Sequence, residues 1–191
     1  HLDLHSFPTR RSSDLEMVYD GNAHTNKTYT VHYGDDEIEG TEGQTEFTLS
    51  TGDKLTVTPS TAATITHVAE SDVDNAFTWT VENEGFYTKG EDVVGALTVT
   101  PATLTIVTEG ASKEYDGEEL TADGSISGFV TPTGGEQETA TFTVTGTQTE
   151  VGKSDNTYSL EWNGTAVESD YELDETIGKI AKFFDADINE F

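Results

Sequence analysis

The sequence has 191 residues, of which 33% are hydrophobic and 24% are charged, a composition that suits one large or two small globular domains. Nine Lys and Arg residues against 37 Asp and Glu residues give a net charge of -28, and such a field repels nucleic-acid phosphates and anionic membrane surfaces. The absence of cysteine excludes disulfide bonds, thiolate metal sites and a cysteine nucleophile. No run approaches the roughly 18 to 20 apolar residues that a membrane-spanning helix needs. We therefore expect neither nucleic-acid binding nor membrane insertion.

The first fifteen residues differ from the rest of the chain. They contain Arg10 and Arg11, the two arginines of the sequence. From Asp3 to Leu15 the segment resembles, residue for residue, the translation of a common sequencing adapter. We therefore predict that residues 1–15 are an artefactual or disordered segment that lies outside the fold.

From Glu16 onward the chain alternates Thr, Val, Tyr, Phe, Leu and Ile with polar residues in short runs, the period-two pattern of β-strands. Glycine, asparagine and aspartate between the runs supply turns. No window has the i, i+3, i+4, i+7 apolar spacing of a convincing helix, so an all-β fold is predicted. The predicted strands are 28–33, 46–50, 54–58, 64–68, 76–82, 96–100, 103–108, 125–130, 139–145, 157–162 and 171–173.

Several short motifs occur twice in the same order. The sequence Tyr19-Asp20-Gly21 recurs as Tyr115-Asp116-Gly117. Three further pairs follow: 55–58 with 142–145, Ser71-Asp72 with Ser154-Asp155, and Trp79 with Trp162. Order of this kind indicates two copies of one domain. We predict two tandem small β-sandwich domains, Ig-like or β-grasp-like, at 16–101 and 102–182, with a C-terminal tail at 183–191.

Each copy is small, so its few large apolar side chains should form the core. Trp79 and Trp162 are the largest of them. The other expected core residues are Tyr29, Val31, Phe47, Leu55, Val57, Phe77, Val81, Leu97 and Val99 in the first copy. In the second copy they are Leu104, Ile106, Phe129, Phe142, Val144, Tyr158, Leu160, Tyr171 and Ile177.

The repeated Tyr-Asp-Gly motif has the chemistry of a turn. Asp-Gly favours a backbone with positive φ, and the tyrosine ring can pack while its hydroxyl finds a polar partner. We interpret Tyr19, Asp20, Gly21 and their second copy, Tyr115, Asp116 and Gly117, as structural turns rather than as a ligand site.

Calcium binding has weak support. Asp185, Asp187 and Asn189 have the spacing of the first ligands of a calcium loop, but Glu190 replaces the required glycine. The acidic run at 35–39 is interpreted as a solvated surface. We expect no metal and no cofactor.

Catalysis has equally little support. Outside the first fifteen residues the histidines are His24, His32 and His67, and none lies in a nucleophile elbow or a paired-histidine zinc motif. We expect no catalytic residues and no enzyme activity. A crosslink from Lys54 or Lys113 to an asparagine remains an alternative for these lysines.

Four stretches of the second copy, ATLTI, SKEYDG, TFTVTGTQTEVGKSDN and SDYEL, resemble the MBG/YDG family of bacterial surface-protein repeats. The resemblance covers most of 102–182 and parts of 16–101. It implies tandem modules in large adhesin-like proteins associated with the cell wall, outside the cell.

Our leading hypothesis is a non-catalytic tandem repeat segment of a large bacterial cell-surface or secreted protein, acting as a stalk or adhesion module. Its expected partners are glycans or proteins of a host or cell surface, and we expect a monomeric segment of a longer chain. The alternative is an accessory carbohydrate-binding or spacer module of a secreted polysaccharide-degrading enzyme, which requires exposed aromatic rings.

Overall fold

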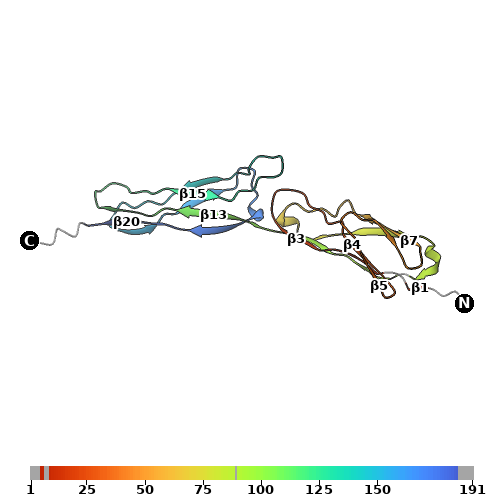
Figure 1. The fold of residues 1–191 in the computed structure, drawn as a ribbon. Helices are drawn as coiled ribbons and strands as arrows, with labels where there is room; N and C mark the ends of the chain where they lie inside the picture. The colour runs from red at the N-terminus through yellow and green to blue at the C-terminus, as the bar shows by residue number, and fades with distance from the viewer. Residues whose placement is uncertain (1–4, 7–8, 89, 185–191) are drawn as a thin grey trace, which may run out of the picture. The chain divides into compact units, whose positions relative to one another are not determined.

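The computed structural model describes residues 5–6, 9–88 and 90–184, and these residues form a nearly all-β structure (Figure 1). The helices among them are three-residue 3-10 turns: η1 (Val68–Glu70), η2 (Glu84–Phe86) and η3 (Glu168–Asp170). None of these turns has the length or the apolar character to cross a membrane. The all-β prediction is confirmed, and the helix that a β-grasp arrangement would pack on its sheet is absent from the described residues.

The chain divides into two compact units, His1–Thr100 and Pro101–Phe191. The first unit contains a four-stranded, two three-stranded and one two-stranded sheet among its described residues. Its strands are β1 (His5–Ser6), β2 (Thr9–Ser12), β3 (Leu15–Val18), β4 (Tyr29–Tyr33), β5 (Asp36–Glu39), β6 (Glu46–Thr48), β7 (Lys54–Pro59), β8 (Val73–Asp74), β9 (Phe77–Val81), β10 (Tyr87–Thr88), β11 (Asp92–Val93) and β12 (Ala96–Thr100). The sheet orders are β11-β2-β4-β5, β3-β12-β8, β6-β7-β9 and β1-β10.

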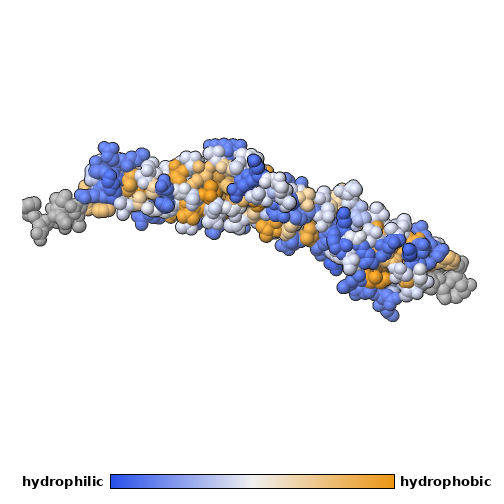
Figure 2. Space-filling model, turned by 45° about the horizontal axis from the view of Figure 1, so that its top comes forward, coloured by the Kyte–Doolittle hydropathy of each residue, from blue (hydrophilic) through white to orange (hydrophobic). Residues whose placement is uncertain are grey.

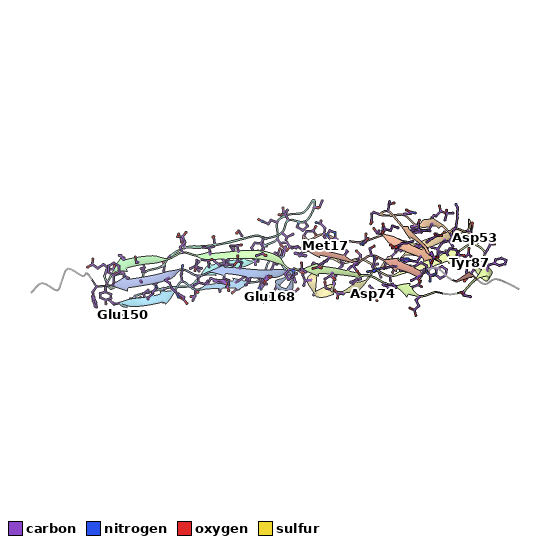
Figure 3. All side chains as sticks on the ribbon, turned by 60° about the horizontal axis from the view of Figure 1, so that its bottom comes forward. Met17, Asp53, Asp74, Tyr87, Glu150 and Glu168 are labelled. Atoms are coloured by element: carbon purple, nitrogen blue, oxygen red, sulfur yellow. The ribbon has the colours of Figure 1, made fainter. Side chains whose placement is uncertain are left out.

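Alternation builds the core of the first unit. In β4 and β7 every second side chain is buried, which places Tyr29, Val31, Leu55 and Val57 inside. Phe77, Trp79 and Val81 of β9 are partly buried against this cluster. At one end Tyr87 joins the core, and its hydroxyl donates to Asp53 Oδ2 at 2.6 Å (Figure 3).

The N-terminal segment belongs to the first unit, so the prediction that residues 1–15 lie outside the fold is wrong for its described residues. Strand β2 lies between β4, its antiparallel partner, and β11, its parallel partner. Backbone pairing depends little on side-chain identity, so the segment can fill this position. Arg10 is fully buried there, with its guanidinium 3.6 Å from the ring centroid of Trp79 and bonded to Asp92. The resemblance to a sequencing adapter concerns the origin of the segment and stays a prediction.

The second unit contains two three-stranded sheets and a hairpin among its described residues. Its strands are β13 (Ala102–Thr108), β14 (Ala111–Glu114), β15 (Gly124–Ser127), β16 (Thr141–Val144), β17 (Gly152–Asp155), β18 (Tyr158–Glu161), β19 (Tyr171–Thr176) and β20 (Lys179–Phe183). The sheet orders are β15-β13-β19, β14-β20-β17 and β16-β18. Figure 1 shows β13 and β15 side by side within this unit.

The two units share one pattern of strand pairing. In the first unit β2 pairs antiparallel with β4 and parallel with β11. In the second unit β13 pairs in the same way, antiparallel with β15 and parallel with β19. Likewise β12 lies between parallel β3 and antiparallel β8, as β20 lies between β14 and β17. The hairpin β7-β9 corresponds to β16-β18. The two units therefore share this pairing pattern, to which the first unit adds β1, β5, β6 and β10.

A buried asparagine ties each unit together where its first strand passes from one sheet to the next. In the second unit Asn156 Nδ2 donates to the carbonyl oxygens of Glu109 at 3.0 Å, Asp123 at 3.1 Å and Ala122 at 3.2 Å. In the first unit Asn75 Nδ2 donates to two carbonyl oxygens, those of Ser13 and Asn26, each at 2.9 Å. These side chains give backbone carbonyl oxygens beside the crossing a hydrogen-bond donor; Asp123 O also accepts the Glu109 N–H.

The two asparagines correct the sequence alignment. Asn75 N–H donates to Gly95 O, and Asn156 N–H donates to Gly178 O, so Asp74-Asn75 corresponds to Asp155-Asn156. The predicted match between Ser71-Asp72 and Ser154-Asp155 is displaced by two residues.

The two tryptophans do not occupy equivalent positions either. Trp79 lies in β9 opposite Val57, whereas Trp162 follows the last residue of β18. Both tryptophans are half-buried rather than fully enclosed.

The core of the second unit is thin. Its fully buried apolar residues are Ala102, Leu104, Ile106, Ala166, Tyr171 and Ile180. Of the predicted core, Phe129, Phe142, Val144, Tyr158 and Leu160 are half-buried, and Ile177 is exposed. On the face shown in Figure 2, hydrophobic residues of this unit are interspersed with hydrophilic ones. Hydrogen bonds and ion pairs therefore contribute much of what holds this unit in a single structure.

The tight crossing beside Asn156 yields the first prediction. A Cβ at Gly178 would lie 2.2 Å from the carbonyl oxygen of Glu109, whereas a Cβ at Gly117 would meet nothing within 4 Å and would suffer only from its positive φ. We expect Gly117→Ala to cost about 1–2 kcal/mol of unfolding free energy. We expect Gly178→Ala to cost clearly more, because backbone must move. Urea unfolding in a Trp79→Phe background, where Trp162 fluorescence reports on the second unit, measures both; equal losses would contradict the assignment of Gly178 to a backbone contact.

Candidate functional site

The Tyr-Asp-Gly motifs follow the parallel ladders that β3 forms with β12 and β14 forms with β20. Tyr115 follows β14, and its N–H donates to Phe183 O at 2.8 Å, which extends the pairing of β14 with β20. Tyr19 follows β3, and its N–H donates to Thr100 O at 2.8 Å. The motif is thus the point where the entering strand leaves its partner, the last strand of the unit.

The Asp-Gly pair then turns the chain in the same way in both units. Asp116 Oδ1 accepts the N–H of Glu118 at 3.1 Å, and Asp20 Oδ1 accepts the N–H of Asn22 at 2.9 Å. A side chain that binds the backbone two residues later mimics a turn. Gly117 and Gly21 have φ of 76° and 75°, the left-handed values that Asp-Gly favours.

The two tyrosines have different surroundings. Tyr19 is 4% exposed and stacks on His67 with ring centroids 5.8 Å apart. Tyr115 is 39% exposed and meets the edge of Phe184 at 5.9 Å. The turn geometry is therefore common to both motifs, and the environment of the tyrosine ring is not.

In the second unit the turn holds a cluster of charges, Lys113, Asp116 and Lys182, which we call the lysine–aspartate cluster. The Lys182 side chain is fully buried, and its Nζ donates to Asp116 Oδ1 and, at 2.7 Å, to the carbonyl oxygen of Glu118. Lys113 Nζ lies 2.5 Å from Asp116 Oδ2. Lys113 and Lys182 are opposite each other in the β14–β20 register, so one carboxylate separates two neighbouring ammonium groups.

The cluster fixes the charge of its aspartate. Hydrogen bonds from Lys113, then Lys182 and the Glu118 N–H, hold the pKa of Asp116 far below its usual range. The same contact raises the pKa of Lys113. An ionised carboxylate occupied by two ammonium groups is a poor proton donor and a poor acyl donor, so the arrangement serves to join strands. The Lys113 ammonium meets a carboxylate here, and the asparagine crosslink suggested for it has no support in this contact.

The first unit uses a histidine in place of the lysines. His24 Nε2 lies 2.8 Å from Asp20 Oδ1. Burial alone would raise the pKa of Asp20, but hydrogen bonds from His24 and Asn22 outweigh it and lower the pKa. The positions matching Lys113 and Lys182 in the β3–β12 register are Met17 and Val99.

The described residues offer little to a metal ion. No group of three His, Asp or Glu side chains suited to holding one is present within residues 5–6, 9–88 and 90–184. Asp36 and Glu37 of the acidic run lie exposed in β5, and Glu37 Oε1 is 3.7 Å from His32 Nε2. The calcium-like spacing at Asp185, Asp187 and Asn189 lies outside the described residues.

The tryptophans have at least one ring face engaged. Trp79 carries the Arg10 guanidinium, and its Nε1 donates to Asp92 Oδ2 at 3.2 Å. Trp162 stacks on Tyr171 with centroids 5.9 Å apart. The Tyr171 hydroxyl donates to buried Glu138 at 2.6 Å, and burial followed by this bond raises the tyrosine pKa. A hollow of about 420 Å³ lies elsewhere, lined by threonines, Pro59 and Lys27.

The burial of Lys182 was not predicted, although the sequence of its strand carries a signal for it. In the segment Lys179–Phe183 the inward positions alternate, and they fall on Ile180 and Lys182. A lysine on the buried face of a strand requires a carboxylate or carbonyl partner. The carboxylate partner is Asp116, the aspartate of the Tyr-Asp-Gly motif that follows β14.

The buried ammonium makes the two partners unequal. We expect Asp116→Ala to destabilise the second unit more than Lys182→Met. Asp116→Ala leaves the buried Lys182 ammonium with only the Glu118 carbonyl oxygen as acceptor and opposite the like charge of Lys113. Lys182→Met replaces the buried ammonium by an apolar side chain of similar length. Thermal melts of both variants measure the two decreases in melting temperature, and a larger decrease for Lys182→Met would contradict this ranking. Lys54→Met, at an exposed pair with Glu46, is the matched control and should change little.

The depressed pKa of Asp116 sets the pH dependence of this contribution. Because the folded pKa lies below the ordinary value of about 3.9, the stabilisation is complete above that value and is lost as pH falls toward the folded pKa. We expect the difference in melting temperature between the natural chain and Asp116→Asn to be constant near neutral pH and to shrink below about pH 4. A difference that grows on acidification would contradict the ion pair.

Comparisons with protein-family models, with curated proteins and with solved structures find no match for this chain.

Proposed function

We propose that the chain is a non-catalytic tandem repeat segment of a large bacterial cell-surface or secreted protein, serving as a stalk or adhesion module. The observation that carries the proposal is the repeated strand pairing of the two units. The last strand of the first unit, β12, ends at Thr100, and the first strand of the second, β13, begins at Ala102. A fold whose exit strand leads after one residue into the next entry strand suits a series of modules.

The chemistry of the Tyr-Asp-Gly turns supports a structural role in this series. The carboxylate of Asp116 is occupied by Lys113, Lys182 and a backbone N–H. Asp20 is likewise occupied by His24 and Asn22. Asp116 is bound on both carboxylate oxygens and Asp20 on Oδ1, so each carboxylate is engaged within its own turn, which supports a structural role.

The proposed setting is the outside of the cell. The sequence resemblance to MBG/YDG repeats supports this location, and the net charge of -28 keeps such a surface solvated and disfavours association with nucleic acids. Partners, in this proposal, are glycans or proteins of a host or cell surface, and the segment itself is monomeric within a longer chain.

The carbohydrate-binding alternative depends on free aromatic faces. Trp79 has Arg10 over its ring, and Trp162 stacks on Tyr171, so each has one face less to offer a sugar. We therefore prefer the stalk or adhesion role.

Long-read sequencing of the source DNA tests the proposal. We expect an open reading frame that continues on both sides with further Tyr-Asp-Gly repeats and carries a secretion signal. A frame without further repeats and without a secretion signal would contradict it. Glycan-array binding by the full chain that is lost in Trp162→Ala would instead favour the carbohydrate-binding alternative.

A further inference from the structure

In each unit the entering strand and the leaving strand are hydrogen-bonded neighbours that run in the same direction. In the second unit β14 and β20 pair from Ala111↔Ile180 to Glu114↔Phe183, and the Tyr115 N–H adds one more bond to Phe183 O. In the first unit β3 and β12 pair in the same sense over four residues, and Tyr19 adds the corresponding bond. In the second unit the preceding strands β13 and β19 also pair in parallel, so the entering and leaving segments contact each other in both sheets.

This geometry determines how tension loads the ladder. A pull on the chain draws the entering strand toward its N-terminal end and the leaving strand toward its C-terminal end. Because the strands are parallel, the two pulls oppose each other along the strand axis and load the ladder hydrogen bonds together. An antiparallel pair pulled at one edge would open bond by bond. Forced unfolding is limited by the unfolding barrier, so bonds that must break together raise the resistance.

We propose that the parallel ladder between entering and leaving strands is a shear clamp that carries mechanical load. This inference rests on the proposed stalk role and deepens it, since a stalk transmits force between its ends. The hairpin β16-β18 contributes no strand to the clamp. In the second unit the clamp consists of β13 and β14 on the entering side, paired in parallel with β19 and β20 on the leaving side, and β15 and β17 lie at the outer edges.

The lysine–aspartate cluster strengthens the clamp of the second unit. Buried Lys182 of β20 bonds to Asp116 and to the Glu118 carbonyl oxygen, both of which follow β14 in the chain, so sliding the two strands apart must also break these contacts. The cluster therefore resists the same displacement as the ladder. The first unit has Met17 and Val99 at the lysine positions, so its clamp lacks this ion pair and yields at lower force.

Single-molecule force spectroscopy on the full chain tests the clamp by loading the same strand in two directions. The sequence has no cysteine, so an introduced one gives a unique handle. Thr103→Cys, exposed near the start of β13, combined with a C-terminal handle, loads β20 in shear. Glu150→Cys with the same C-terminal handle peels β20 from antiparallel β17, because Glu150 lies at the end of the unit where β20 ends (Figure 3) and Gly152 pairs with Lys182.

We expect the rupture force in the Thr103 geometry to exceed that in the Glu150 geometry by about twofold or more, since only the first loads the ladder bonds together. Equal forces, or a weaker Thr103 geometry, would overturn the clamp. This comparison uses the natural β14, β20 and cluster, so it does not depend on a destabilised variant folding. It is also independent of cellular location: a failed clamp leaves the sequencing test of the proposed function untouched, and a failed location leaves the force result standing.

A pair of substitutions tests the role of the cluster. Lys182→Met should lower the rupture force in the Thr103 geometry. Leu160→Ala, half-buried in the β16-β18 hairpin, should lower equilibrium stability in urea while leaving that force unchanged. If both variants lower the rupture force in proportion to their loss of equilibrium stability, the cluster has no mechanical role of its own.

Discussion

Each unit depends on one constraint: a single entering strand must serve two sheets. In the second unit β13 pairs in one sheet and β14 in another, and the chain passes between them at Glu109 and Gly110. At that crossing the backbone cannot complete its hydrogen bonds within either sheet, and Asn156 supplies the missing donors. Gly178 keeps the last strand close enough for the crossing to be covered. The ladder of β14 with β20, and the turn after it, follow from this passage.

The amount of buried apolar surface explains why polar contacts matter so much here. The first unit encloses a cluster of aromatic and aliphatic side chains around Tyr29 and Leu55. The second encloses fewer large groups and instead buries Thr108, Glu138, Asn156, Asp170 and Lys182. A small domain with a thin core keeps a single structure only if its buried polar groups are bonded. Asn156 Nδ2 and Lys182 meet this condition through bonds to backbone carbonyl oxygens and to Asp116, whereas Asn156 Oδ1 is buried without a partner.

Much of the strand pattern was readable from sequence because alternating side chains report directly on which face is buried. The positive φ of Gly21 and Gly117 was equally readable, since Asp-Gly has a strong local preference. What sequence could not reveal was long-range: Asn156 acts on carbonyl groups more than 30 residues away, and no local pattern marks such a contact. Trp162 is half-buried against Tyr171 rather than enclosed, and residue size alone does not predict that difference. The strand formed by residues 9–12 was not predicted because the resemblance to a sequencing adapter excluded residues 1–15 from the fold.

The asparagine and glycine at the sheet crossing have a consequence for recognising related modules. Apolar positions of a strand can exchange Val, Thr, Leu or Ile with little penalty, so the hydrophobic pattern fades quickly as copies diverge. Asn75 and Asn156 donate hydrogen bonds to backbone carbonyl oxygens, and an apolar side chain cannot make these bonds. Gly95 and Gly178 lie so close to neighbouring backbone that a Cβ atom would clash with it. A divergent copy should therefore retain a three-point signature, Tyr-Asp-Gly, then Asn, then Gly, after its strands have ceased to resemble each other.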